Sequence, residues 1–274
     1  MGQEKKKHLN KLLEFVKELY DDPGNKEFVA GIQSMVLQDI KNDHKEEWTR
    51  QISEIYELCL KKNLQEQAED LYKDFPLQEI APELADLYVQ MEDSRRRNDF
   101  DSFGLRLYQQ IELIVNKVLE DPEVVDLYDR IRDLPPVLKY DSIQRRMIRV
   151  VDSRHSTVEE YLLLKSSNVG KPLKDLWALE RIRIVIYAVG FLAGVEKYPR
   201  DKAFKEQVDT ISAIYNVRNH DAHSGATASD KQEEYYEAII ADPTQNYLRF
   251  LAFLLSFIKE ISANYPLSDE IKSI

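Results

Sequence analysis

The sequence predicts an all-α protein. Only 8 glycines and 10 prolines interrupt its 274 residues, and most of the chain repeats apolar residues every three to four positions, the period of a helix with one buried face. No segment alternates apolar and polar residues for long enough to predict a strand. We therefore expect a helical bundle domain preceded by a smaller helical domain.

The first part of the chain is predicted to form short helices separated by polar turns. The turns are marked by Asp21 to Asn25, Asn42-Asp43 and Phe75-Pro76, residue types that favour caps and turns. No fixed period relates the helices, so we do not expect structural repeats. The expected helices are Leu9 to Tyr20, Lys26 to Ile40, Lys45 to Lys62, Leu64 to Lys73 and Pro82 to Met91.

A polar interval from Glu92 to Asp99 separates these helices from the rest. We expect a domain boundary there, with an N-terminal helical domain at residues 1–92 and a helical bundle domain at residues 93–274. The bundle is predicted to contain helices at Asp101 to Glu120, Leu173 to Val195, Asp201 to Ala222 and Tyr247 to Ile261. The second of these is apolar nearly all round and should be buried, and the third should end at Gly225.

Composition limits the classes of function and the compartment. No apolar run approaches the roughly 20 residues of a membrane span, and the N-terminus has no signal-peptide pattern. Cys59 is the only cysteine, which fits a cytoplasmic, reducing compartment. Its helical core spacing predicts a buried structural thiol and not a nucleophile.

The charge balance argues against broad affinity for nucleic acid. There are 38 Lys and Arg against 49 Asp and Glu, a net charge of −11, which repels phosphate backbones. Three arginine clusters depart from this average, and each can follow a phosphate backbone or form a solvated or ion-paired helix face. They are Arg95-Arg96-Arg97, Arg145-Arg146 with Arg149, and Arg181 with Arg183.

The residues with chemical potential lie near the end of the predicted helix Asp201 to Ala222. This segment contains Arg218, then Asn219, and His223 four residues further on. At roughly 100° per residue, Val208, Ile211, Ile214 and Tyr215 are predicted to form an apolar stripe that includes the position of Arg218. Asn219 and His223 fall together on one flank of it.

An arginine on an apolar stripe requires a partner, either a carboxylate of its own chain or a ligand phosphate. RNA cleavage without a metal requires a group that transfers protons and a fixed cation for the negative charge of the transition state. Histidine titrates in the range suited to the first task, and a guanidinium group provides the second. Arg218 and His223 are therefore candidate catalytic residues, and Asn219 can hold the imidazole or a phosphate oxygen.

The Arg-x4-His spacing, with Asn directly after Arg, resembles the signature of the HEPN superfamily, all-helical domains many of which are metal-independent endoribonucleases. The resemblance covers about residues 93–265 and is specific only at 218–223. It implies an RNA substrate, no cofactor or metal, and a homodimer that brings two copies of the motif together. It also implies a supporting polar residue on the helix Asp101 to Glu120, for which Gln109 and Glu112 are the candidates. His220, within the motif segment itself, is a third candidate for a supporting residue.

This resemblance predicts a toxin or defence effector that a regulatory protein or ligand controls through residues 1–92. The alternatives are a catalytically inactive HEPN-like protein that binds nucleotide or protein, and an unrelated helical interaction protein with a chance motif. His220 and His223 can also be interpreted as a metal-binding pair, although His8, His44 and His155 do not form a ligand-spaced cluster with them. His155 precedes a predicted helix capped by Ser156 or Thr157, with Glu159 or Glu160 in its first turn.

Overall fold

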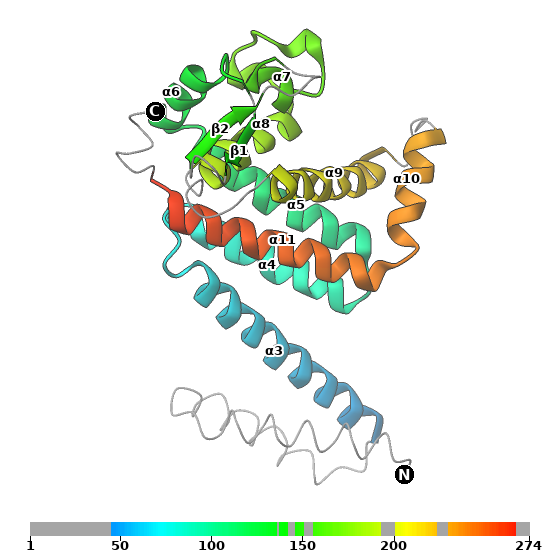
Figure 1. The fold of residues 1–274 in the computed structure, drawn as a ribbon. Coiled ribbons are helices and arrows are strands. Elements are labelled where there is room, and N and C mark those ends of the chain that lie inside the picture. The colour runs from blue at the N-terminus through cyan, green and yellow to red at the C-terminus, as the bar shows by residue number, and fades with distance from the viewer. Residues whose placement is uncertain are drawn as a thin grey trace. The chain divides into compact units, whose positions relative to one another are not determined.

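A computed structural model describes residues 45–135, 137–141, 146–150, 156–192, 201–223 and 230–266 (Figure 1). The helices predicted at Leu9 to Tyr20 and Lys26 to Ile40 lie outside these ranges. The described part is predominantly helical, and the all-α fold class is confirmed. The chain divides into two compact units, residues 1–66 and 67–274.

The first described helix, α3 (Lys45–Tyr72), is continuous where two helices were predicted. The expected break after Lys62 is wrong, because Asn63 is flanked by good helix formers and no proline or glycine interrupts them. In the first unit, Cys59 is 3% exposed. Burial raises the pKa of its thiol, against a smaller opposing effect of Lys62. The predicted burial of this thiol is thereby confirmed.

The second unit contains the other helices and one hairpin. Its elements are α4 (Ala81–Arg96), α5 (Phe100–Val118), α6 (Pro122–Ile131), β1 (Val137–Asp141), β2 (Arg146–Val150), α7 (Val158–Leu162), α8 (Ala178–Val185), α9 (Asp201–His223), α10 (Asp230–Ile240) and α11 (Pro243–Asn264). The domain boundary predicted near residue 92 falls within α4, which packs against α5 in this unit.

Several helices begin at N-cap residues of types that the sequence shows to be favourable. Asp99, Asp121 and Asp242 each accept a hydrogen bond from a backbone N–H in the first turn of α5, α6 and α11. Thr157 does the same for α7, while the Glu160 carboxylate accepts from the backbone N–H of Ser156. The predicted cap of the helix after His155 is therefore confirmed, with Thr157 as the N-cap.

The antiparallel hairpin β1–β2 pairs Val137 with Val150 and Asp141 with Arg146. No strand is predicted from the sequence, so this hairpin differs from the expectation. The fold class is unchanged. Each strand is only five residues long, so the alternation of side chains is too short to stand out in the sequence.

The helix predicted from Leu173 to Val195 differs from the structure in its continuity. A single 3₁₀ turn, η3 (Leu173–Asp175), is followed by extended backbone at Leu176 and Trp177, and α8 begins only at Ala178. A π-helix, η4 (Ile186–Leu192), continues from α8. The predicted burial is confirmed for α8, where Ile182, Ile184 and Val185 have no exposed surface, but it is wrong for Trp177, which is 43% exposed.

Helix α5 is the centre of the second unit. It packs against α4, α8, α9 and α11 (Figure 1), and ten of its residues are buried. Rings of Phe100 and Phe103 meet the ring of Tyr247 from α11 edge to face, with centroids 4.9 and 4.8 Å away. This packing places α8 and α9 beside the middle of α5, where the candidate site lies.

Candidate functional site

Helix α9 carries the Arg218-Asn219-x3-His223 motif in its C-terminal part and ends at His223. The predicted helix Asp201 to Ala222 is confirmed to within a residue. Gly225, predicted as the residue after its end, lies outside the described ranges. The backbone at His220 and His223 is helical, and their side chains are outside the description.

The buried face of α9 is rotated by roughly a quarter turn from the predicted apolar stripe. Val208 and Tyr215, predicted to lie on the stripe, are half-buried. Arg218 is also half-buried, although its helical angle falls between those of Ile211 and Ile214, which have no exposed surface. Arg218 thus keeps its predicted place on the stripe, and only its partial exposure differs from the full burial of its neighbours. The residues of α9 that are buried are Phe204, Thr210, Ile211, Ala213, Ile214 and Val217.

The close approach of α5 and α9 explains this rotation. Gly104 of α5 faces Val217 of α9, and a Cβ atom at Gly104 would lie 2.6 Å from Val217 Cγ1. Real Cβ atoms do not come that close to another carbon, so α9 can lie at this distance only because residue 104 has no side chain. Val217 is thereby fully buried at the contact between the two helices.

The Arg218 guanidinium group has two partners among the described side chains. Its Nη1 donates a hydrogen bond to Oδ1 of Asn219 at 2.8 Å, and its Cζ lies 5.5 Å from the centroid of the Tyr108 ring. No carboxylate within the described part forms an ion pair with it. The amide and the aromatic ring orient the cation without neutralising it.

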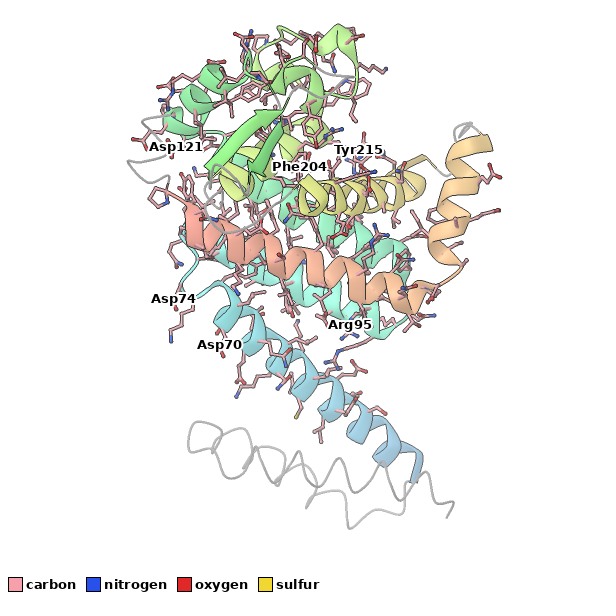
Figure 2. All side chains as sticks on the ribbon, in the orientation of Figure 1. Asp70, Asp74, Arg95, Asp121, Phe204 and Tyr215 are labelled. Carbon is pink, nitrogen blue, oxygen red and sulfur yellow. The ribbon has the colours of Figure 1, made fainter. Side chains whose placement is uncertain are left out.

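Tyr108 of α5 is buried beneath Arg218, with 1% of its surface exposed. Its hydroxyl group has no hydrogen-bond partner among the described residues. Burial raises the pKa of this phenol; Glu112 and Tyr215 raise it further, while Arg218 and Arg181 lower it. The Tyr215 ring, labelled in Figure 2, lies 5.8 Å from the Tyr108 ring.

Four side chains from three helices therefore act on one buried phenol, that of Tyr108. We call the five residues together the Tyr108 cluster: Tyr108 and Glu112 of α5, Arg181 of α8, and Tyr215 and Arg218 of α9. The cluster holds two permanent cations and one carboxylate. Its local charge is thus opposite in sign to the net charge of the chain, and anions are favoured there.

The two supporting candidates on α5 differ in their surroundings. Glu112 is half-buried and acts on the Tyr108 phenol. Gln109 instead accepts a hydrogen bond from Arg106 Nη1 at 2.9 Å, and no contact with Arg218 is seen for it. Of His220, the third candidate, the structure describes only the backbone.

Sequence reasoning missed Tyr108 and gave Arg181 no specific role. Tyr108 directly follows Leu107, a core position of α5. In the sequence, an aromatic residue at position 108 looks the same as one that only packs in the core. Arg181 was visible as part of a basic pair with Arg183. Arg181 and Arg183 have different surroundings because two residues that are two positions apart on a helix point in different directions.

Three arginines of the sequence clusters are engaged in structural contacts. Arg95 forms a bidentate ion pair with the buried Glu92, the shorter contact being 2.6 Å, and Arg97 pairs with Asp93 at 3.0 Å. Arg183 donates to the backbone carbonyl of Tyr161, and burial lowers the pKa of its guanidinium group. Arg95, Arg97 and Arg183 are thus tied within the fold. The side chains of Arg145, Arg146 and Arg149 are outside the description.

The metal alternative rests on histidine side chains that the structure does not describe. Within the described residues, no group of three or more His, Cys, Asp and Glu side chains is placed to hold a metal ion. The His220 and His223 pair therefore stays a hypothesis.

Comparisons of the chain with protein-family models, with curated proteins and with solved structures gave no match. None of the helices in the described ranges combines the length and the apolar character that crossing a bilayer requires. The function is accordingly argued from the Tyr108 cluster and the motif on α9.

Proposed function

We propose that this chain is a metal-independent endoribonuclease of the HEPN type. Arg218 and His223 are its catalytic residues, and Asn219 orients Arg218. The proposal is carried by one observation, a half-buried guanidinium group held by an amide and an aromatic ring and paired with no carboxylate among the described side chains. Such a cation is free to take up the charge of a phosphate.

The chemistry divides between the two motif residues. The imidazole of His223 accepts the proton of the 2′-hydroxyl group or donates one to the leaving 5′-oxygen. The 2′-oxygen attacks phosphorus, the bond from phosphorus to the 5′-oxygen breaks, and a 2′,3′-cyclic phosphate remains on the upstream fragment. Arg218 stabilises the charge on the non-bridging oxygens while this occurs.

The Tyr108 cluster supports this division of roles. A guanidinium group resting on an aromatic ring keeps a fixed orientation, and its N–H groups at the ring's edge remain able to donate. Fixed donors stabilise a developing charge better than mobile ones because they do not have to reorganise. One motif supplies one histidine, so we further propose a homodimer in which two motifs form a composite site.

The proposed biological role is that of a toxin or defence effector. The acidic N-terminal residues, with 12 basic and 19 acidic side chains in residues 1–90, would contact the regulatory protein or ligand. An acidic segment favours a partner with a basic surface.

The test is incubation of the purified protein with end-labelled RNA in excess EDTA. We expect cleavage that leaves a 2′,3′-cyclic phosphate, and we expect Arg218→Ala and His223→Ala to abolish it without loss of folding. Arg218→Lys should restore little activity because the planar fork is lost. Strict dependence on a divalent ion would contradict this mechanism and favour the His220 and His223 pair. RNA binding without any cleavage would favour the inactive HEPN-like alternative.

A further inference from the structure

The segment between α7 and α8, residues 163–177, displays large apolar side chains at the surface. Leu164, Val169 and Trp177 are each more than 40% exposed. They are three of the eight large hydrophobic residues exposed in the described part of the chain, and they lie within 14 consecutive positions. We call this segment the Trp177 loop. Clustered exposed apolar residues mark interaction sites.

The Trp177 loop is held in shape by the buried carboxylate of Glu180. Its two oxygens accept hydrogen bonds from the backbone N–H groups of Leu164 and Trp177 and from the Asn168 side chain, at 2.9 to 3.0 Å. Glu180 is fully buried and Asn168 is 2% exposed. Both ends of the loop are thereby attached to one group, which fixes the position of Trp177 before any ligand arrives.

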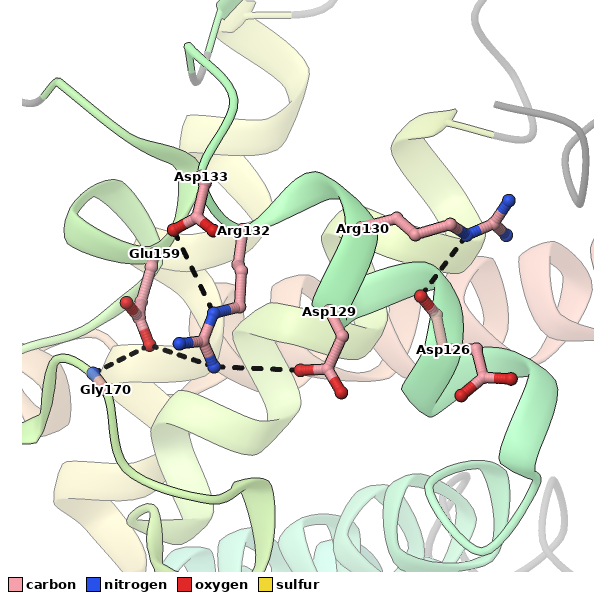
Figure 3. A network of polar contacts seen from close by, with 7 residues as sticks. All are labelled: Asp126, Asp129, Arg130, Arg132, Asp133, Glu159 and Gly170. Atoms are coloured by element: carbon pink, nitrogen blue, oxygen red, sulfur yellow. Dashed lines mark hydrogen bonds and ion pairs between the residues drawn. The ribbon is translucent and has the colours of Figure 1, made fainter.

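A second network fixes the middle of the loop (Figure 3). The backbone N–H of Gly170, which has a φ of +80° that suits glycine, donates to the Glu159 carboxylate at 3.0 Å. Arg132 lies 3.9 Å from the same carboxylate and also approaches Asp129 and Asp133. The loop is therefore a preorganised surface, which reduces the entropy lost on binding.

The loop is basic, although the chain as a whole is acidic. It contains Lys165, Lys171 and Lys174 against a single acidic residue, Asp175, and all four are exposed. The Lys165 ammonium group lies 4.2 Å from the centre of the Trp177 ring. Aromatic surface flanked by cations is the combination that binds single-stranded nucleic acid, in which bases stack and phosphates carry charge.

The loop leads directly to the Tyr108 cluster. Trp177 precedes the first residue of α8, and its carbonyl oxygen accepts a hydrogen bond from the N–H of Arg181 at 3.0 Å. Arg181 is thus one helical turn from Trp177 and acts on the Tyr108 phenol together with Arg218. Trp177, with the Lys165 ammonium group over its ring, thus lies next in the sequence to the helix that carries Arg181.

We propose that the Trp177 loop binds single-stranded RNA and leads it to Arg218. One base stacks on Trp177, the loop lysines contact phosphates, and Arg181 holds the phosphate between the loop and the motif. The inference rests on the proposed RNA substrate and names the residues outside the motif that select its single-stranded form. Lys165 does not block the ring, since a cation at an exposed aromatic face is held less tightly than a stacked base.

The binding test uses Trp177 as its own probe. The chain has two tryptophans, Trp48 and Trp177, so Trp48→Phe leaves Trp177 as the only tryptophan, which can be excited selectively over the tyrosines. We would titrate this variant with a 2′-O-methyl oligouridylate, which cannot be cleaved because it lacks the 2′-hydroxyl group. We expect quenching of the fluorescence, and a weaker response to double-stranded RNA of the same length.

Substitutions then identify the groups responsible. Trp177→Ala should weaken binding of a labelled oligonucleotide roughly five- to a hundred-fold, and Trp177→Phe should retain most of it. Replacing Lys165, Lys171 and Lys174 by Gln should lower the salt dependence of binding, and the slope should change by about 0.7 for each phosphate that is no longer neutralised. Leu248→Ala, which removes another exposed apolar side chain, is the matched control and should bind as the parent.

The outcomes separate this inference from the proposed ribonuclease. Unchanged affinity in both Trp177→Ala and the lysine variant overturns it, even if Arg218→Ala abolishes cleavage. Equal quenching by a polyglutamate peptide also overturns it and indicates an acidic protein partner. RNA binding that depends on Trp177, in a protein that cuts no RNA, supports this inference and removes the proposed nuclease activity.

Discussion

The guanidinium group of Arg218 lies over the ring of Tyr108, with its Cζ 5.5 Å from the ring centroid. The two residues come from α9 and α5, 110 positions apart in the sequence. The contact gives a half-buried arginine an aromatic partner where no carboxylate among the described side chains pairs with it. We expect substitutions to test this contact, the helix packing around it, the anchoring of the Trp177 loop and the proposed dimer.

Tyr108→Phe should preserve or raise stability, because it removes a buried hydroxyl group that has no partner among the described residues and keeps the ring under Arg218. An unsatisfied buried polar group costs about 1–3 kcal/mol, so we expect a gain of up to about 1 kcal/mol in urea unfolding. Tyr108→Leu should lower stability and also lower cleavage by misplacing Arg218. A marked loss of stability in Tyr108→Phe would mean that the hydroxyl group has a partner.

Gly104→Ala should destabilise the protein although alanine is the better helix former. Alanine favours the helix by about 1 kcal/mol, but overlap with the stiff side chain of Val217 costs about 1–3 kcal/mol. We expect a melting temperature lower by a few degrees. In a Val217→Ala background the overlap is gone, so the same substitution should be neutral or stabilising. Equal effects in both backgrounds would argue against the close approach of α5 and α9.

Glu180→Gln should lower the free energy of unfolding by at least about 2 kcal/mol, since hydrogen bonds to a charged acceptor contribute about 1.5–3 kcal/mol each. The amide NH₂ would also face donors of the Trp177 loop. Chemical denaturation measures the change, and the exposed Glu237→Gln on α10 is the matched control. Similar stability in the two variants would contradict the anchoring role of Glu180.

Mixing His223→Ala subunits in excess with wild-type subunits should reduce RNA cleavage below the level expected from simple dilution. In a composite site each active unit needs two motifs, so mixed dimers lose activity. Sedimentation at the assay concentration provides the control for dimer formation. Activity proportional to the wild-type fraction, or a fully active monomer, would refute the composite site.

Local sequence signals determined the helices and the position of the motif. Periodic apolar residues predict α5, α9 and α11, and caps such as Asp99, Thr157 and Asp242 mark helix starts because their side chains accept from the first turn. The hairpin and the continuity of α3 were missed, since short strands and weak helix interruptions leave little periodic signal. The Arg-Asn-x3-His spacing could be recognised in the sequence because, like the caps, it is a pattern of neighbouring residues.

Only the tertiary structure decided what surrounds Arg218. The sequence placed Arg218 on an apolar stripe, but it did not show that the absence of a side chain at Gly104 lets α9 approach α5 closely enough to bury Val217, the residue before Arg218. Tyr108 and Arg181 join it from helices distant in the sequence. Periodicity shows that a helix has an apolar face, but the angle at which that face meets its neighbour depends on side-chain volumes from both helices.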